Sequence, residues 1–148
     1  MIVILLLCIP SNSYAEGEIT CLAKNIYFES RNQPTLGQIA VGQVTMNRVN
    51  SPKFPNTVCG VVKQGGEKRN RCQFSWYCDG KSDEIPKIDA DLWNYVLAMS
   101  TKIASGYWAD ITHGATHYHA DYVTPGWAKS KHKTAKIGDH IFYIWKIR

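Results

Sequence analysis

Residues 21–49, CLAKNIYFESRNQPTLGQIAVGQVTMNRV, decide the fold, because they hold two amphipathic helix patterns that meet at a polar turn. In the first pattern Ile19, Leu22 and Ile26 recur at the spacing of one helical stripe, the side that a helix buries. Glu29 continues this stripe three residues after Ile26. Burial disfavours the charged form of a carboxyl group and raises its pKa, which suits a general acid working near neutral pH. The stripe can equally run out into solvent at the helix end, so spacing alone leaves two interpretations of Glu29.

The second helix pattern starts after Pro34. Thr35 and Gln38 have the T-x-x-Q spacing of a capping box, in which two side chains bond free backbone N–H groups at the helix start. The expected buried side comprises Leu36, Ile39, Ala40 and Val44, and Gln43 and Asn47 interrupt it. A short helix over residues 58–62 is expected next, and residues 89–105 predict a longer core helix.

Strands are expected mainly in the last third of the chain, around residues 117–122 and again over residues 136–145, where hydrophobic residues alternate. Residues 64–83 are loop-rich, and within them the sequence QFSWY at residues 73–77 predicts a strand or hairpin arm. Aromatic residues beside polar ones in this arm are suited to line a sugar cleft, although ordinary strand packing explains them equally well.

Residues 1–15 match a secretory signal. An apolar run at residues 2–7 is too short to span a bilayer, and it is followed by Pro10 and small or polar residues with Ser13 and Ala15 before the expected cut. The expected mature domain is therefore residues 16–148. An uncleaved anchor is the alternative.

Removal of this segment leaves four cysteines, Cys21, Cys59, Cys72 and Cys78. An even number in a small exported domain indicates disulfides, and four cysteines allow three pairings. The short spacing of Cys72 and Cys78 favours a local bridge, which leaves Cys21 for Cys59, but the sequence does not choose among the pairings. A zinc site is the weaker alternative, because neither C-x-x-C nor paired histidine spacing is present.

The chain of 148 residues has a formal net charge of +5, which cleavage leaves unchanged because residues 1–15 contain no charged side chain. Export and basic charge together favour an anionic polymer outside the cell, such as a bacterial cell wall, over nucleic acid.

A histidine cluster in the last third raises the question of a metal. His113, His117 and His119 lie close in sequence and Asp121 follows them, yet no H-E-x-x-H or comparable pattern is present. We therefore expect no metal, and we expect these histidines, His119 among them, and Tyr118 either to hydrogen-bond within a strand or to line a cleft.

Several linked motifs then point to a family. They are NIYFESRNQPxxGQIAVxxVxxNRV at residues 25–49, FPNTVCGVV at 54–62, QFSW at 73–76, THYHA at 116–120, PGW at 125–127 and IGDHIFY at 137–143. In this order they resemble the cell-wall hydrolases typified by spore-cortex-lytic enzymes, over nearly the whole chain from Cys21 to Trp145. The resemblance implies an α+β, lysozyme-like fold that is mostly helical, has a small antiparallel strand region and is stabilised by disulfides.

The resemblance also implies cleavage of peptidoglycan between N-acetylmuramic acid and N-acetylglucosamine, with Glu29 as the catalytic acid. The family commonly has a second Glu four residues later, where this chain has Gln33, so no catalytic role is carried over to Gln33. The expected substrate contacts are Gln38, Phe74, Trp76, Tyr118, His119 and Trp127. The expected protein is a secreted or periplasmic monomer that needs no cofactor, binds peptidoglycan glycan strands and not nucleic acid, and is not stably inserted in a membrane.

No second carboxylate is placed beside Glu29 by the sequence. The resemblance favours a lytic transglycosylase, which needs only one carboxylate and closes a 1,6-anhydro ring on the muramoyl sugar. Hydrolysis by a muramidase is the alternative within the same substrate class, with Asp79, Asp83 or Asp121 as the second carboxylate. Two other classes remain open, a zinc-dependent peptidase or amidase built on the histidine cluster, and a non-catalytic wall-binding module that stacks sugars on Trp76, Tyr118 and Trp127.

Export gives the first testable prediction. Because the apolar run precedes Ser13-Tyr14-Ala15, we expect the mature protein to begin at Glu16. The measurement is the intact mass of protein recovered from the periplasm or the medium. Recovery of full-length protein in the cytoplasm alone would contradict export.

Overall fold

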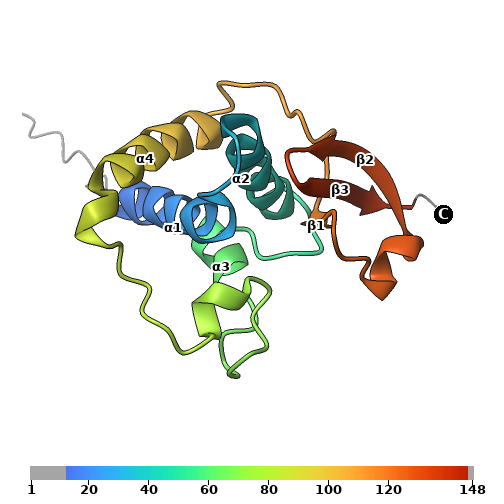
Figure 1. The fold of residues 1–148 in the computed structure, drawn as a ribbon, viewed down its shortest axis with the longest axis horizontal. Coiled ribbons are helices and arrows are strands. Elements are labelled where there is room, and N and C mark those ends of the chain that lie inside the picture. The colour runs from blue at the N-terminus through green and yellow to red at the C-terminus, as the bar shows by residue number, and fades with distance from the viewer. Residues whose placement is uncertain (1–12, 147–148) are drawn as a thin grey trace, which may run out of the picture.

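Residues 13–146, the part of the chain that the computed structural model describes, form four α-helices and a three-stranded sheet. The helices lie on one side and the sheet on the other, with helix α2 between helix α1 and the sheet (Figure 1). The expected α+β class with a small antiparallel sheet is therefore confirmed. The predicted signal peptide, residues 1–15, lies outside the described residues except for its last three, where α1 begins.

The α-helices are α1 (Ser13–Ser30), α2 (Thr35–Val49), α3 (Val58–Val62) and α4 (Ala90–Ala104). The short 3-10 helices are η1 (Ser75–Cys78), η2 (Lys87–Asp89) and η3 (Gly126–Ser130). The strands are β1 (His117–Ala120), β2 (Lys131–Ile137) and β3 (His140–Trp145). All four α-helices agree with the helical patterns of the sequence.

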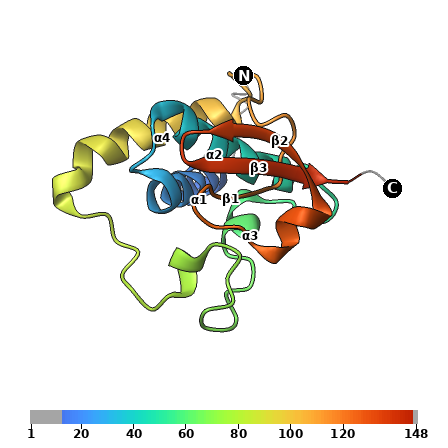
Figure 2. The same cartoon turned by 45° about the vertical axis from the view of Figure 1, so that its right-hand side comes forward.

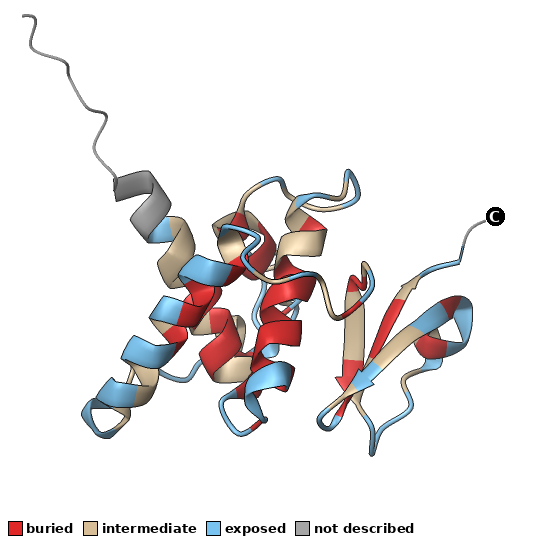
Figure 3. Cartoon of the chain, turned by 90° about the horizontal axis from the view of Figure 1, so that it is seen from above, coloured by how far each residue is buried: buried red, intermediate tan, exposed pale blue. Residues whose placement is uncertain are grey.

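Helices α1 and α2 pack closely, and buried residues gather where the helices meet (Figure 3). Leu22 and Ile26 are fully buried, so the predicted stripe of α1 is correct. The helices approach closely at Gly42 of α2, where a Cβ would lie 2.8 Å from a methyl carbon of Ile26 and 2.7 Å from one of Ile103, so a larger residue would have to displace these side chains. The stripe predicted for α2 is wrong at Leu36, which is 60% exposed, because the buried side of the first turn carries Gly37 and Gln38 instead.

The turn between α1 and α2 differs from the predicted capping box. Helix α2 is preceded by Pro34 and has no side-chain cap, and the Thr35 hydroxyl lies 3.3 Å from the Tyr95 hydroxyl instead. The buried Gln38 side chain turns back under the loop, where its amide donates to the carbonyl oxygen of Gln33 at 3.0 Å. The capping box fails because loop carbonyls take up the Gln38 amide.

Helix α3 is capped by Thr57, whose hydroxyl accepts a hydrogen bond from the Gly60 N–H at 3.0 Å. The disulfide Cys21–Cys59 joins α3 to α1. The carboxylate of Glu18 accepts the Val58 N–H at the start of α3 at 2.5 Å. Helix α1 therefore holds α3 by a covalent bond and a charge-assisted hydrogen bond.

The strand predicted for residues 73–77 is wrong, because residues 75–78 form the 3-10 helix η1. The disulfide Cys72–Cys78 gives the physical reason, since its two Cα atoms are 5.9 Å apart. An extended chain rises about 3.3 Å per residue, so a straight strand would separate these cysteines by about 20 Å. Both disulfides pair as expected, and the local one forces the aromatic segment into a turn.

The sheet has the order β1-β3-β2 with antiparallel pairs, and it lies in front of α2 in the view of Figure 2. The strand expected over residues 136–145 is instead the end of β2, a turn and all of β3. The turn needs Gly138, which has a φ of +55°. A Cβ there would also lie 2.6 Å from the side-chain oxygen of Gln33, so this hairpin packs against the turn between α1 and α2.

The two disulfides enclose loops of very different length, with sequence separations of 38 and 6 residues. A disulfide stabilises the folded state mainly because it restricts the unfolded chain, and the effect grows with the length of the loop. Removal of Cys21–Cys59 should therefore lower the free energy of unfolding by about 4 kcal/mol, and removal of Cys72–Cys78 by about 2 kcal/mol. Urea denaturation of the two double Cys→Ala variants measures this order. A greater loss from the Cys72–Cys78 pair would contradict it.

Candidate active site

Glu29 lies in the last turn of α1, half-buried, and its carboxylate faces the sheet. The hydroxyl of Tyr118 in β1 donates a hydrogen bond to Glu29 Oε2 at 2.6 Å, although the two residues are 89 positions apart in the sequence. Of the two interpretations of Glu29, the stripe that leads into the interior is correct. The solvent-exposed helix end is excluded.

Tyr118 is held by the face of the sheet that packs on α2. Its ring lies 5.7 Å from the ring of Phe142 and 5.0 Å from that of His140, measured between centroids. Burial, followed by the negative charge of Glu29, raises the pKa of the Tyr118 hydroxyl well above 10. Tyr118 therefore stays protonated and acts as a fixed donor to Glu29.

Arg48, near the end of α2, brings a buried positive charge to the same site. The residue is only 3% exposed, and its Nε donates to the carbonyl oxygen of Thr116 at 2.7 Å. The guanidinium carbon lies 5.1 Å from the ring centroid of Phe54 and 5.0 Å from that of Phe74. One of its terminal nitrogens, Nη1, is buried and has no hydrogen-bond partner among the described residues. Burial lowers the pKa of Arg48, and the charge of Glu29 opposes that shift.

The pKa of Glu29 is raised, and burial is the main cause. The hydrogen bond from Tyr118 and the charge of Arg48 act in the opposite direction, because both favour the carboxylate. Burial thus favours the protonated carboxyl group, and Tyr118 and Arg48 favour the carboxylate. A carboxyl group in this position can donate a proton and then take one back.

A pocket of about 270 Å³ lies beside the residue that precedes Glu29. Its lining comprises Phe28, Arg31, Trp76, Asp79, Lys81, Ser82 and Asp83. Phe28 and Trp76 stack with ring centroids 4.7 Å apart, and the Trp76 indole N–H donates to the side-chain oxygen of Asn25 at 2.9 Å. Trp76 therefore forms a fixed wall of the pocket.

The three candidate second carboxylates are separated by the fold. Asp79 and Asp83 line this pocket, and burial raises the pKa of Asp83. Asp121 forms an ion pair with Lys136 at 3.1 Å. Asp79 and Asp83 thus lie around the pocket that Phe28 lines, whereas the charge of Asp121 acts on His140 at the sheet.

The structure does not bring the other expected substrate contacts, Gln38, Phe74, His119 and Trp127, to one place. Phe74 is buried under Arg48, and Gln38 is buried under the turn. Successive side chains of a strand point to opposite faces, so His119 lies on the face of β1 away from Tyr118. His119 Nε2 lies 2.9 Å from the Tyr143 hydroxyl, and the ring of Trp127 is 5.6 Å from that of His119.

The histidine cluster does not assemble a metal site in the described part of the chain. Residues 13–146 contain no group of three or more His, Cys, Asp or Glu side chains placed to hold a metal ion. Burial and the charges of Lys131, Arg48 and Lys53 lower the pKa of His117 to about 4, so its ring is neutral at physiological pH.

Two polar residues of α2 have a role that the sequence did not assign. The Gln43 amide donates to the carbonyl oxygen of Ala109 at 2.8 Å and its oxygen accepts the Ile111 N–H at 2.9 Å. Asn47 donates to Asp110 at 2.9 Å and to the carbonyl oxygen of Ala115 at 2.9 Å. The signal was present, since these are the polar residues that interrupt the buried side of α2. They fix the segment that leads into β1 and so position Tyr118.

Comparison with known sequences gives consistent matches. The sequence model of the Cell Wall Hydrolase family matches residues 32–143. The spore cortex-lytic enzyme of Halalkalibacterium halodurans is 35% identical over 131 residues, which are 87% of this chain and 35% of that protein. The spore cortex-lytic enzyme of Bacillus subtilis is 29% identical over 129 residues, which are 87% of this chain and 38% of that protein. The chain therefore spans well under half the length of these relatives.

Solved structures match the fold more completely. The catalytic domain of the Bacillus cereus SleB protein superposes with a TM-score of 0.71 at 32% identity, covering 90% of this chain and 94% of that domain. The catalytic domain of the germination-specific lytic transglycosylase SleB from Bacillus anthracis gives a TM-score of 0.70 at 34% identity, covering 90% of this chain and 99% of that domain.

The raised pKa of Glu29 predicts how stability depends on pH. The folded state holds the Glu29 proton more tightly than the unfolded state, so this contribution to stability is complete below about pH 4.5 and is lost as the pH rises through the folded pKa. Glu29→Gln resembles the protonated form and does not titrate. Its free energy of unfolding relative to wild type should therefore rise with pH over this interval, as measured by urea denaturation at a series of pH values.

The matched variant for this experiment is Tyr118→Phe, which removes a hydrogen bond that lowers the pKa of Glu29. The contribution of protonated Glu29 to stability should be lost at a higher pH in Tyr118→Phe than in wild type. A free-energy difference between Glu29→Gln and wild type that is constant or falls with pH would contradict the buried acid.

Proposed function

The chain belongs to the cell wall hydrolase family, and on this basis we propose that it cleaves peptidoglycan glycan strands between N-acetylmuramic acid and N-acetylglucosamine. The observation that carries the proposal is the half-buried Glu29, whose pKa is raised and whose carboxylate is held by the Tyr118 hydroxyl at 2.6 Å. Support comes from the match to catalytic domains of SleB, one of which is described as a lytic transglycosylase.

In the proposed first step, protonated Glu29 gives its proton to the oxygen that links muramic acid C1 to N-acetylglucosamine O4. The C1–O4 bond breaks, N-acetylglucosamine leaves with a free 4-hydroxyl, and positive charge develops at C1. The Glu29 carboxylate that remains is stabilised by the Tyr118 hydroxyl and the charge of Arg48, which both favour the ionised form.

In the second step the Glu29 carboxylate removes the proton from the C6 hydroxyl of the same muramoyl sugar. Oxygen O6 bonds to C1 and closes a 1,6-anhydro ring, and Glu29 is again protonated. No water is consumed, and one residue serves as acid and then as base. A raised pKa suits this cycle, because a group that changes roles needs a pKa near the working pH.

A hydrolytic muramidase is the second candidate within the same substrate class. It is favoured by Asp79 and Asp83, which line the pocket beside Phe28. Two-carboxylate hydrolysis requires separations of about 5 to 9.5 Å between the carboxyl groups. In that route water, activated by Asp79 or Asp83 or attacking a covalent intermediate, supplies the new hydroxyl at C1.

The setting that we propose is the wall outside the cytoplasmic membrane, with the protein secreted or periplasmic and acting as a monomer without a cofactor. Within residues 13–146 no helix has the length and apolar character needed to cross a membrane. Trp76, as a wall of the pocket beside Phe28, is the aromatic residue that we propose to contact sugar.

The zinc-dependent peptidase and the non-catalytic wall-binding module predict different products. Glycan cleavage gives new reducing or anhydro sugar ends, a peptidase gives cut stem peptides, and a binding module leaves the wall unchanged. Mass spectrometry of digested peptidoglycan separates these classes. Digestion in ¹⁸O-labelled water further separates the two glycan reactions, because only hydrolysis places ¹⁸O at the new muramic acid end.

Replacement of Glu29 gives the prediction for activity. Glu29→Gln removes the transferable proton but keeps the shape, so release of fragments should fall by about 10² to 10⁴-fold or more. Glu29→Asp withdraws the carboxyl group by roughly 1 Å and should lose about 10²-fold. The measurement is muropeptide release in the presence of EDTA by proteins whose folding is verified by circular dichroism. Near wild-type turnover by folded Glu29→Gln would contradict the role, and loss of wild-type activity in EDTA would favour the zinc enzyme.

A further inference from the structure

The face of the sheet away from Tyr118 carries a group of aromatic and cationic side chains. We call it the cationic aromatic surface, and it consists of Lys53, His117, Trp127, Lys131 and Trp145. His117 lies 4.9 Å from Trp145 and 5.6 Å from Trp127, measured between ring centroids. Lys131 is paired with Trp145 across β2 and β3, so their side chains share one face.

Two ammonium groups lie on the same tryptophan ring. Lys131 Nζ is 3.4 Å from the centroid of Trp145, and Lys53 Nζ is 4.3 Å from it. Lys131 is also 5.8 Å from the Trp127 centroid and is only 7% exposed, although it lies near the molecular surface. The ring faces attract both cations, but they do not neutralise them.

The positive charge at this surface is unopposed among the described residues. Neither ammonium group has an ion pair or a hydrogen bond there, and the ion pair found in residues 13–146 joins Lys136 to Asp121. Burial and then the charge of Lys53 lower the pKa of Lys131, and no acid acts on it. A surface with like charges, partly desolvated and without a counter-ion, attracts an anionic group.

This surface adjoins the candidate active site. His117 directly precedes Tyr118, whose hydroxyl holds Glu29. The ring of Phe54 lies between the two regions, 5.1 Å from the guanidinium carbon of Arg48 and 6.2 Å from the ring centroid of His117. The surface and Tyr118 lie on opposite faces of the sheet, so a polymer bound at Glu29 would reach the cationic aromatic surface by passing Phe54 and the edge strand β1.

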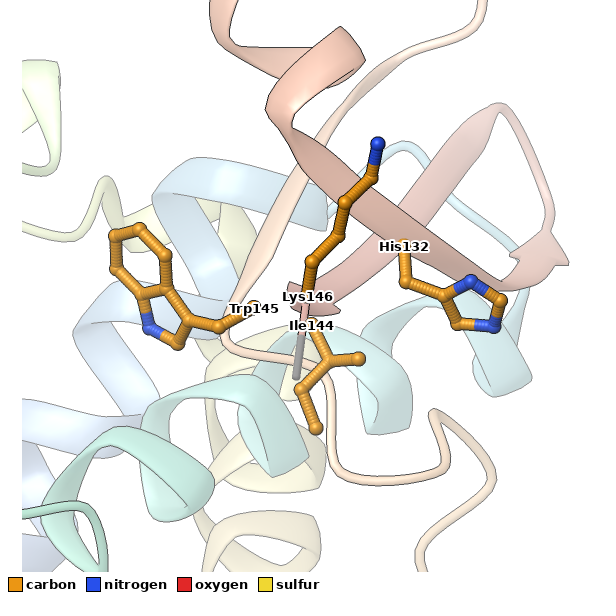
Figure 4. Close-up of a pocket in the computed structure, with 4 residues that line it drawn as sticks. All are labelled: His132, Ile144, Trp145 and Lys146. Atoms are coloured by element: carbon orange, nitrogen blue, oxygen red, sulfur yellow. The ribbon is translucent and has the colours of Figure 1, made fainter. Parts of the chain in front are cut away.

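The shared ring is also partly exposed, since Trp145 has 38% of its surface open to solvent. A pocket of about 410 Å³ lies at the end of the strands, lined by Trp145, His132, Ile144 and Lys146 (Figure 4). His132 and Ile144 are paired across β2 and β3 and point to the face opposite to Lys131 and Trp145, so this pocket is separate from the cationic aromatic surface. The exposed part of the indole itself is what remains available to an apolar group next to the two cations.

We propose that Lys53 and Lys131, held on Trp145, bind carboxylate groups of the peptide stems attached to the glycan strand in the Glu29 site. This inference rests on the proposed function. The glycan backbone of peptidoglycan is uncharged where its lactyl groups carry peptides, whereas the stems bear carboxylates beside small apolar side chains. That combination matches two ammonium groups beside an exposed indole. The enzyme would accordingly prefer strands that retain their peptides.

The test compares two substrates that differ only in their stems. Peptidoglycan strands free of teichoic acid are used intact, or after an amidase has removed the peptides and the lactyl carboxylates that this exposes have been coupled to methylamine. For the wild-type chain, kcat/KM should be higher on the peptide-bearing strands. Lys131→Gln removes one charge-assisted hydrogen bond and should lower kcat/KM on these strands by about tenfold, and Lys53→Gln with Lys131→Gln by about a hundredfold. On peptide-free strands the same variants should stay within about twofold of wild type, the range expected when no such bond is lost.

The matched control is Lys102→Gln in α4. Lys102 also lies over aromatic rings, 5.3 Å from Tyr107 and 5.5 Å from Trp108, but on the helical side of the molecule. This variant should leave the preference for peptide-bearing strands unchanged. Added salt should reduce the preference in wild type, because screening weakens contacts between partly exposed charges.

Three outcomes would overturn the proposal. An equal loss on both substrates would show that the lysines only stabilise the fold, and an unchanged ratio in the double variant would show that they bind nothing. A loss confined to walls that carry teichoic acid would assign the surface to phosphate groups of that polymer instead.

Failure of the proposed glycan cleavage can be told apart from failure of the stem site, because without glycan cleavage the wild type would cleave neither substrate. In that case a soluble disaccharide-peptide is titrated into the wild-type chain while Trp145 is followed by NMR. Saturable shifts that disappear in the double variant support the stem site, and their absence rejects it.

Discussion

The hydrogen bond between Tyr118 and Glu29 is the contact on which the structure of the site depends. It joins the end of α1 to the edge strand β1, two elements that are separated by most of the chain. Neither element alone gives a buried acid. Helix α1 provides the stripe that turns Glu29 inward, and the sheet provides the donor that covers it. The other polar contacts between the two parts serve this alignment, since Gln33 bonds Asp139 through both its donor and its acceptor and Asn47 holds the segment before β1.

The surroundings of Glu29 act on its pKa in opposite directions, since burial raises it whereas Tyr118 and Arg48 lower it. Burial alone would leave Glu29 protonated, and an ion pair alone would leave it ionised. Here the buried Arg48 is held on two aromatic rings and bonded to a backbone carbonyl, and it affects Glu29 through its charge. Tyr118 donates directly and remains protonated because burial raises its pKa. A proton on Glu29 can therefore leave and return without a large change in the surroundings, as acid and base roles on one residue require.

The helices were predictable from sequence because they follow from a period of 3.6 residues, a local property. The same period placed Glu29 on the buried stripe but left open whether the stripe ends in solvent. Local spacing favoured the observed disulfide pairing without excluding the other two pairings. The errors arose where distant contacts overrode local preference. Residues 73–77 alternate like a strand, but the bond from Cys72 to Cys78 bends them, and Gln38 turns from a cap to loop carbonyls. Tyr118 and the histidines beside it were expected to hydrogen-bond within a strand or to line a cleft. Tyr118 and His119 both form hydrogen bonds, but strand alternation places them on opposite faces of the sheet. Arg48 was missed, since nothing in the sequence reveals that a guanidinium lies between two rings beside a distant carboxylate.

The direct titration of Glu29 tests the central claim, that a buried acid is kept ready to exchange its proton. The measurement is the ¹³C NMR shift of the Glu29 carboxyl carbon as a function of pH, in wild type and in Tyr118→Phe. We predict a single titration with a pKa above the ordinary value of 4.5, displaced further upward when the Tyr118 hydroxyl is absent. A wild-type pKa at or below 4.5, or a downward displacement in Tyr118→Phe, would contradict this account of the site.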